Sequence, residues 1–427
     1  MARRTVLLNP GPVNISERVR QALLRADICH REGEFSSLMA SIRSRLCAAF
    51  APSGYTAVLI TGSGSAALEA ALVSSVEPGR AILAVVNGVY GERIARMARV
   101  HGIRVVEVTT GWTEPPDLAQ VEALLARDPG IQVVAMVHHE TTTGLINPVA
   151  EVGSLTRAAG KSLLVDSISG LGGEALDLRA QRVDLCVGTA NKCIQGVPGL
   201  AFVLVGHEEV ARLAGIPPRS VYLNLPSHWE AQEKGDPLFT PAVQAAYALD
   251  EALAELLEET VAGRIARYGR AAALLREGFV RLGLSPLLPA PLRGNTITAL
   301  ELPQGVSYAS LHDQLKAQGF VIYAGQGVLA TRIFRVANMG DISLEEYRQF
   351  LTVLEAVLPL GGGHGPSPRA SGSGAPVSAL CSFEHGPCPR NRGRRFGTRS
   401  SLAEARLWRA RAGGECTGTE PPSERRK

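Results

Sequence analysis

Short, nearly uninterrupted apolar runs alternate with amphipathic segments between about residues 50 and 205 of this chain. The amphipathic segments, such as 65–75, 91–101, 118–127 and 152–159, have the spacing of helices. Strands that are apolar throughout are buried on both faces, as in a parallel sheet covered by helices on each side. The sequence therefore predicts an α/β fold with a mostly parallel, seven-stranded sheet. The candidate strands are 57–60, 81–86, 105–108, 133–137, 163–165, 185–187 and 201–205.

The pattern changes near residue 241, where long stretches rich in Ala, Leu and Glu begin. Helices that alternate with a few short strands indicate a small α+β unit. We therefore expect a large domain over residues 1–240 and a smaller domain over 241–360. The final helix should begin at Ser343, because Ser-Leu-Glu-Glu is close to a capping pattern. The expected helices here are 241–262, 264–282, 307–318 and 343–358, and the expected strands are 296–301, 321–323 and 334–337.

Residues 361–427 differ in composition, being rich in Gly, Pro, Ser and Arg, and we expect a disordered basic tail. This tail has twelve Lys or Arg and five Asp or Glu, a net charge of +7. The preceding 360 residues then hold 32 basic and 35 acidic groups, a net charge of −3. A mildly acidic body gives no reason to expect nucleic-acid binding.

Neither the hydropathy nor the cysteine pattern indicates a membrane or an extracellular protein. No apolar run approaches the roughly 18–20 residues that a membrane-spanning helix needs. The seven cysteines are scattered and odd in number, without a C-x-x-C pair. Reduced thiols in a cytoplasmic protein are the expectation.

Lys192 is one of only five lysines in the chain, and it has no charged neighbour in the stretch V-G-T-A-N-K-C-I-Q-G-V-P-G. Partial burial of a lysine disfavours its ammonium form and favours the neutral amine. A neutral amine can form a Schiff base with an aldehyde. A lysine at a loop surface is the alternative that this stretch alone leaves open.

Two further stretches follow predicted strands at their carboxyl ends, where ligands bind in open α/β sheets. Ser63, Gly64 and Ser65 open a helix, and amides at a helix N-terminus bind phosphate. Part of a dinucleotide fingerprint is present, but Ala67 replaces its third glycine. Asp166 follows the strand 163–165, where it could pair with a protonated ring nitrogen or act as a simple helix cap.

Three more candidates lie near predicted strands. In H-H-E-T-T-T-G (138–144) the adjacent histidines would point in opposite directions, so we expect no metal. A hydroxyl of Thr141 or Thr143 is the more plausible ligand for a ring oxygen. Tyr90 could stack on a flat ring, and Arg335 could bind a carboxylate with two hydrogen bonds.

In this order, the elements resemble the class V, fold-type I pyridoxal-phosphate aminotransferases, from L-N-P-G-P near residue 9 to the last helix. Within that class, D-I-C-H-R-E-G-E-F (27–35), H-x-E-T-T-T-G-x-x-N-P (138–148) and A-N-K-C-I-Q-G-V-P-G (190–199) are similar to the 2-aminoethylphosphonate–pyruvate transaminases. The last string is the most specific. The alanine–glyoxylate and serine–pyruvate aminotransferases share the architecture but have a different lysine loop.

The resemblance implies a fold-type I enzyme with pyridoxal 5′-phosphate as its cofactor, and it gives the candidate residues roles. Lys192 would form the Schiff base with the cofactor and move protons, and Asp166 would pair with the ring nitrogen. Arg335 would bind the substrate's carboxylate, and Thr240 would reach the neighbouring subunit's phosphate in a homodimer. The remaining implied cofactor contacts are the phosphate ligands Ser63, Gly64 and Ser65, Thr141 near the ring hydroxyl, and the stacking Tyr90.

The implied reaction transfers the amino group of 2-aminoethylphosphonate to pyruvate, giving phosphonoacetaldehyde and L-alanine. The nearest alternative is the same chemistry on another donor, as in alanine–glyoxylate or serine–pyruvate transamination. An alternative of another class is a dinucleotide-binding oxidoreductase. It rests on residues 62–69 alone and leaves Lys192 without a role.

Overall fold

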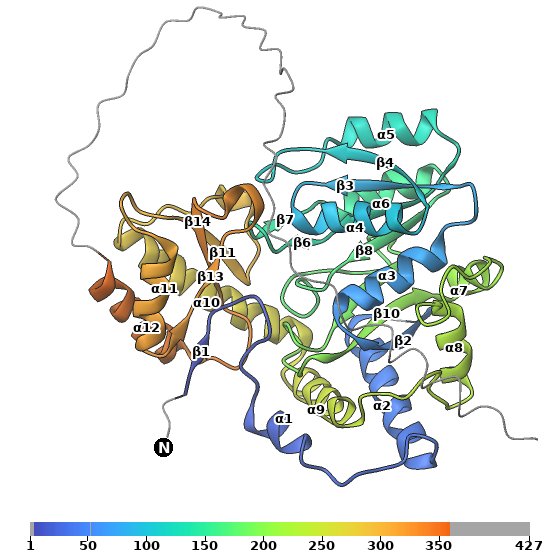
Figure 1. Cartoon of the computed structure of the whole chain (residues 1–427), viewed down its shortest axis with the longest axis horizontal. Coiled ribbons are helices and arrows are strands. Elements are labelled where there is room, and N and C mark those ends of the chain that lie inside the picture. Colours follow the sequence, from blue (N-terminus) through green and yellow to red (C-terminus); the bar gives the residue numbers. More distant parts are fainter. Residues whose placement is uncertain (1–3, 52, 359–427) are drawn as a thin grey trace, which may run out of the picture. The chain divides into compact units, whose positions relative to one another are not determined.

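A seven-stranded sheet is the centre of the structure, and Figure 1 shows helices on both of its faces. In spatial order, its strands are β2 (Tyr55–Gly62), β10 (Gly199–Gly206), β9 (Leu185–Thr189), β8 (Ser162–Asp166), β5 (Ile131–Val137), β3 (Ala81–Val86) and β4 (Arg104–Thr109). Neighbours from β9 to β4 are parallel, whereas β10 is antiparallel to both β2 and β9. The predicted mostly parallel sheet is confirmed. This computed structural model describes residues 4–51 and 53–358, so the predicted tail lies outside the described residues.

Two separate hydrophobic clusters cover the two faces of this sheet. Leu83 and Val85 of β3 belong to one cluster, and Ile82 and Ala84 of the same strand belong to the other. Both faces are thus buried, which explains why the strands are apolar at every position. The first cluster includes residues of α1 (Glu17–Ala22), α2 (Gly33–Phe50), α5 (Leu118–Arg127), α6 (Val149–Ala158) and α9 (Val243–Glu259). The second includes residues of α3 (Gly64–Ser75), α4 (Val89–Val100), α7 (His207–Ala214) and α8 (Leu225–Glu233).

The C-terminal part contains a small antiparallel sheet with its own core. Its strands, in spatial order, are β11 (Ile297–Glu301), β14 (Ile333–Ala337) and β13 (Tyr323–Ala324). The helices α10 (Val261–Arg281), α11 (Tyr308–Ala317) and α12 (Leu344–Val357) contribute to the core beside it. From the other end of the chain, β1 (Val6–Leu7) pairs in parallel with β12 (Phe320–Val321). All described residues belong to one compact unit, and the domain boundary at residue 240 stays a prediction.

Local capping sets the ends of the C-terminal helices. The Ser343 side chain accepts a hydrogen bond from Glu346 N, and the Glu346 carboxylate accepts one from Ser343 N, so the predicted start of α12 is confirmed. Thr260 separates α9 from α10 with a positive φ of 67°. Its hydroxyl accepts from Gly263 N and caps α10, three residues before the predicted boundary at residue 263.

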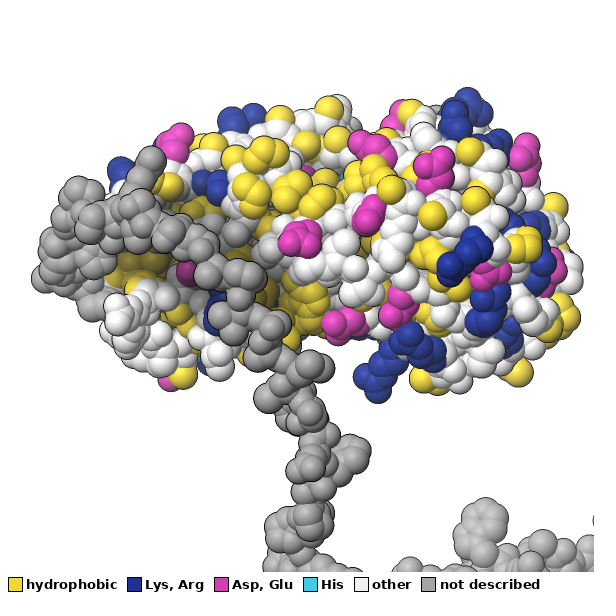
Figure 2. All heavy atoms as spheres, turned by 90° about the horizontal axis from the view of Figure 1, so that it is seen from above, with side chains coloured by type: hydrophobic (Ala, Val, Ile, Leu, Met, Phe, Trp, Pro, Cys, Tyr) yellow, Lys and Arg dark blue, Asp and Glu magenta, His cyan; other side chains and the backbone are white. Residues whose placement is uncertain are grey.

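The surface carries both signs of charge without a basic face in the view of Figure 2, where Lys, Arg, Asp and Glu side chains are interspersed. None of the helices in the described ranges is long and apolar enough to cross a membrane. Within those same residues, no group of three or more His, Cys, Asp or Glu side chains could hold a metal ion.

Candidate active site

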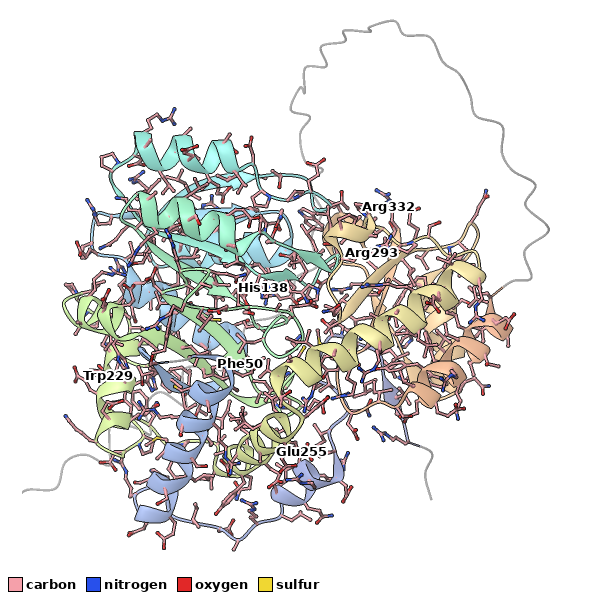
Figure 3. The ribbon with its side chains drawn as sticks, turned by 180° about the vertical axis from the view of Figure 1, so that it is seen from behind. Phe50, His138, Trp229, Glu255, Arg293 and Arg332 are labelled. Carbon is pink, nitrogen blue, oxygen red and sulfur yellow. The ribbon has the colours of Figure 1, made fainter. Side chains whose placement is uncertain are left out.

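The predicted site residues gather where the parallel strands of the large sheet end. His138, just after β5, donates its backbone N–H to Asp166 O at 2.9 Å, and Ser167 N donates to Val187 O at 3.0 Å. These bonds hold the ends of β5, β8 and β9 side by side. Figure 3 labels His138 near the centre of the molecule, on the side of the sheet that faces Arg293 of the C-terminal part. This edge is where open α/β sheets bind ligands.

Lys192 lies in the loop between β9 and β10, under the N-terminal segment of the chain. Its Nζ donates to Pro10 O, and the neighbouring Gly11 has a φ of 99°, in the left-handed region that favours glycine. Burial lowers the pKa of Lys192 to about 8. Cys193 and Asp166 oppose this shift of the pKa, whereas Arg335 and Arg93 add to it. A lysine with this pKa supplies neutral amine near neutral pH, as a Schiff-base lysine must.

Asp166 is buried at the end of β8 with one carboxylate oxygen unused. Its Oδ1 accepts from Ile168 N at 2.9 Å, but its Oδ2 has no hydrogen-bond partner among the described residues. Burial raises the pKa of Asp166 to about 6, against the effect of the Ile168 amide. A buried acceptor left unpaired costs about 1–3 kcal/mol. A protonated ring nitrogen would supply the missing donor.

The segment from Ser63 to Ser65 forms the start of α3 and is free to bind an anion. Ser63 is the N-cap residue, yet its side chain makes no capping hydrogen bond, and the first turn has no acidic residue. A Cβ on Gly64 would lie 2.8 Å from Ile168 Cδ1, which places this turn directly beside the Asp166 loop. Amides in the first turn of a helix have no partner within the helix and favour phosphate.

Tyr90 stands in the first turn of α4, with a cation on its ring. The guanidinium of Arg93 lies 4.5 Å from the ring centroid, and Arg93 Nη1 donates to Ser65 Oγ at 3.3 Å. Burial raises the pKa of the Tyr90 hydroxyl, and Arg93 and Arg335 oppose that rise. The sequence did not identify Arg93 as a site residue, because no pattern near it indicates a contact with Ser65.

Glu140 is a second residue that the sequence analysis passed over. Its carboxylate accepts from Thr142 Oγ1 at 2.6 Å and from Gly91 N at 3.4 Å, so it lies at the start of α4. It is fully buried, and burial raises the pKa of this carboxyl. A Cβ on Gly88 would lie 2.3 Å from the Glu140 carboxyl carbon, so the glycine makes room for it. Glu140 thereby fixes the helix turn that presents Tyr90.

Arg335 on β14 joins the C-terminal sheet to this site. Its Nη1 donates to Thr141 O at 2.7 Å, and its Nε and Nη2 donate to Ala324 O at 2.9 and 2.6 Å. The side chain is fully buried, yet no carboxylate pairs with it within the described part of the chain. Burying a guanidinium without a counter-charge is costly, which favours an anionic ligand beside it.

Thr141 lies beside the loop that follows Asp166. Thr141 Oγ1 and Ser169 Oγ are 2.6 Å apart, whereas Thr143 Oγ1 is buried without a partner among the described residues. His138 Nδ1 lies 3.0 Å from Ser167 Oγ, and His139 contacts Ser169 O instead. Burial lowers the pKa of His138 to about 3 and that of His139 to about 4, so both rings are neutral.

Thr240 is linked to the serine segment only through neighbouring residues among those described, because Tyr222, which stacks on Phe239, donates its hydroxyl to Thr61 O at 3.0 Å. Thr240 is exposed on the connection between α8 and α9, and no hydrogen bond joins it to the residues above within the described ranges. Its neighbour Phe239 stacks on Tyr222 at 4.9 Å between ring centroids. Val221 and Tyr222 are exposed apolar side chains on this surface, 84% and 41% accessible.

Comparison with known proteins decides the family. The model of the family Aminotransferase class-V matches residues 16–350. This chain belongs to the class-V aminotransferase family. A 2-aminoethylphosphonate–pyruvate transaminase of Salmonella schwarzengrund is 39% identical over 364 residues, covering 84% of this chain and 98% of the relative. A protein of the same name from Vibrio cholerae serotype O1 is 38% identical, with 83% and 98% covered.

Solved structures of other aminotransferases share the fold. The alanine–glyoxylate aminotransferase of Nostoc sp. is 29% identical with a TM-score of 0.80, covering 84% of this chain and 96% of that one. The pyridoxamine–pyruvate aminotransferase of Mesorhizobium loti is 29% identical with a TM-score of 0.78, covering 84% and 92%. The predicted fold-type I architecture is confirmed.

Pyridoxal 5′-phosphate is therefore the cofactor of this aminotransferase, as expected from the sequence. The residues at the sheet edge fit it: a partly buried amine at Lys192, an unpaired buried oxygen on Asp166, and the uncapped start of α3 at Ser63. Membership in the family decides against the dinucleotide-binding oxidoreductase.

Proposed function

We propose that this aminotransferase transfers the amino group of 2-aminoethylphosphonate to pyruvate, forming phosphonoacetaldehyde and L-alanine. The carrying observation is the identity of 38–39% to 2-aminoethylphosphonate–pyruvate transaminases over nearly their whole length. Two sequence segments similar to these transaminases contribute to the candidate active site. They are 138–148, which contains Glu140, and 190–199, which contains Lys192. Alanine–glyoxylate transamination is the second candidate, because a structural neighbour at 29% identity has that name.

The proposed mechanism assigns one task to each side chain. The bound cofactor supplies an aldehyde that receives the amino group and a ring that delocalises negative charge. Lys192 Nζ takes the proton from the amino-bearing carbon of the substrate and later returns a proton. Asp166 Oδ2 holds a proton on the ring nitrogen and so keeps the ring electron-poor. The turn from Ser63 to Ser65 binds the phosphate, while Tyr90 and Thr141 orient the ring.

An assay of donors tests the substrate. Purified protein with pyruvate should form alanine from 2-aminoethylphosphonate much faster than from serine under the same conditions. Alanine with glyoxylate as acceptor serves as the competing pair, since it tests the second candidate on the same preparation. A higher kcat/KM for serine, or for alanine with glyoxylate, would contradict the proposed donor and leave the transamination chemistry intact.

Arg335 is proposed to bind the anionic end of the substrates. Arg335→Gln should raise KM for pyruvate about 10- to 100-fold, because a charge-assisted hydrogen bond is worth about 1.5–3 kcal/mol. Steady-state kinetics with varied pyruvate measure this. Arg332→Gln is the matched control, since Arg332 is exposed at the start of the same strand and pairs with Glu301. An unchanged KM in Arg335→Gln would remove it from the substrate site.

We also propose a homodimer in which Thr240 contacts the partner's cofactor phosphate. The exposed position of Thr240 and the apolar surface at Val221 and Tyr222 support this arrangement. The mass of the protein in solution, measured by light scattering, tests it.

A cytoplasmic location is proposed as well, supported by the free thiols of Cys29, Cys47, Cys186 and Cys193. Titration of thiols in protein isolated without reductant would check this point.

A further inference from the structure

Two buried side chains of helix α10, Arg264 and Tyr268, contact the lysine loop, the segment 190–198 between β9 and β10 that contains Lys192. Both donate to the same backbone oxygen, Cys193 O, with Tyr268 Oη at 3.3 Å and Arg264 Nη1 at 2.9 Å. Cys193 is the residue after Lys192, so these two bonds fix the backbone from which the amine projects. The ring of Tyr268 is itself held, because Arg267 lies 4.9 Å from its centroid.

The Tyr268 hydroxyl also holds the far end of the lysine turn. Gln195 Nε2 donates to this hydroxyl at 2.7 Å, and Gln195 N donates to Lys192 O at 2.9 Å. Gln195 has a φ of 69°, in the left-handed region that residues other than glycine adopt only at a cost. The hydrogen bond to Tyr268 holds the Gln195 side chain against α10.

The third partner of the hydroxyl lies in the segment that follows β14, the strand of Arg335. Gly340 N donates to Tyr268 Oη at 3.1 Å, and Asn338 Nδ2 donates to Tyr268 O at 3.1 Å. Both residues follow β14 directly, the strand that carries Arg335. The hydroxyl thus donates once and accepts twice, which uses its full capacity.

We propose that Tyr268 is a positioning residue that fixes Lys192 relative to Arg335 through the three hydrogen bonds of its hydroxyl. The side chain acts through the lysine loop and through the segment after β14. Removing the hydroxyl would free both segments by a small distance and admit water to the amine. This inference rests on the proposed roles of Lys192 and Arg335, and it holds for any amino donor.

The test is Tyr268→Phe in the full-length, cofactor-loaded enzyme. The pH midpoint of the absorbance change of the bound cofactor follows the proton on Lys192 Nζ. It should rise by about half a unit, a roughly threefold change in the protonation equilibrium, because water favours the charged form. kcat should fall about 10- to 100-fold, the scale of a small misplacement. Asp166, Cys193, Arg93 and Arg335, the groups that shift the pKa of Lys192, are all retained.

Tyr347→Phe is the matched control. Tyr347 is equally buried, and its hydroxyl donates to Asn338 O at 3.0 Å, in the segment after β14. This variant loses a comparable hydrogen bond without touching the lysine loop, so its absorbance midpoint should equal that of the wild type. A wild-type midpoint in Tyr268→Phe, or the same shift in both variants, would overturn the proposal.

Gln195→Leu carries the same test if Tyr268→Phe does not fold. It should shift the midpoint in the same direction but by less, because it removes one of the three hydrogen bonds of the Tyr268 hydroxyl. Where Tyr268→Phe folds, the double variant should shift little further than Tyr268→Phe alone, because both changes remove the Gln195–Tyr268 bond. Fully additive shifts would overturn the proposal. Lys192→Ala tests the role of Lys192 independently of the role of Tyr268. If that variant kept the pH-dependent absorbance of the bound cofactor, the proposed function would fail, whatever Tyr268→Phe shows.

Discussion

Lys192→Ala is expected to lower turnover by about 10⁴-fold or more, because in the proposed mechanism this one side chain supplies both the nucleophilic amine and the proton carrier. The shift in absorbance that accompanies attachment of the cofactor should disappear as well. Single-turnover measurements with each substrate would follow the loss. Small primary amines added to the solution should restore part of the rate, since they can replace the base but not its position.

Lys161→Ala is the control for this change. Lys161 also donates to a backbone carbonyl, Pro129 O at 3.1 Å, but it lies at the start of β8, at the opposite end of the strand from Asp166. Its removal should leave both turnover and the absorbance spectrum unchanged. Turnover close to wild type in Lys192→Ala would show that another group provides the amine.

Asp166→Asn should reduce kcat by about 10- to 100-fold, since the charge-assisted bond to the ring nitrogen is worth about 1.5–3 kcal/mol. Asparagine has the same shape, so the loss would report the charge. Asp184→Asn is the matched control: burial raises the pKa of Asp184 to about 6 too, but Asp184 lies at the other end of the sheet and accepts from Leu163 N. Equal losses in the two variants would contradict the assigned role.

The same substitution has a distinct signature in the cofactor-free protein. The pKa of Asp166 is raised from 3.8 to about 6, so the folded state binds its proton more tightly than the unfolded state between these values. The contribution of Asp166 to stability therefore falls as pH rises through that window, by about 3 kcal/mol in total. In thermal unfolding, the Tm of Asp166→Asn relative to that of the wild type should therefore increase as the pH rises over this range. A constant difference in Tm would mean that the carboxylate has another partner.

Features encoded locally were predictable from the sequence. The apolar strands, the start of α12 at Ser343 and the positions of Lys192 and Asp166 at strand ends all depend on neighbours within a few residues. Periodicity and capping report such relations directly. The ends of parallel strands must also meet at one edge, so the grouping of these side chains followed from the topology.

Relations between distant segments left no local signal. Pro10 contacts Lys192, and Tyr268 contacts both Gln195 and Gly340, across separations that no periodicity records. A helix residue such as Tyr268 has the spacing of an ordinary core residue, and only its hydroxyl partners distinguish it. The short strands at 320–321 and 323–324 were expected as one, because the sequence does not show that they pair with β1 and β14 separately.

The pairing of β1 with β12 has a consequence for how the enzyme is made. Residues 6 and 7 can pair only after residues 320 and 321 have been synthesised. Pro10, which contacts Lys192, lies three residues after this strand. Contacts between the two ends of a chain form late, because the entropy of closing a long loop must be overcome first. Synthesis must therefore reach residue 321 before this pairing can help to enclose Lys192.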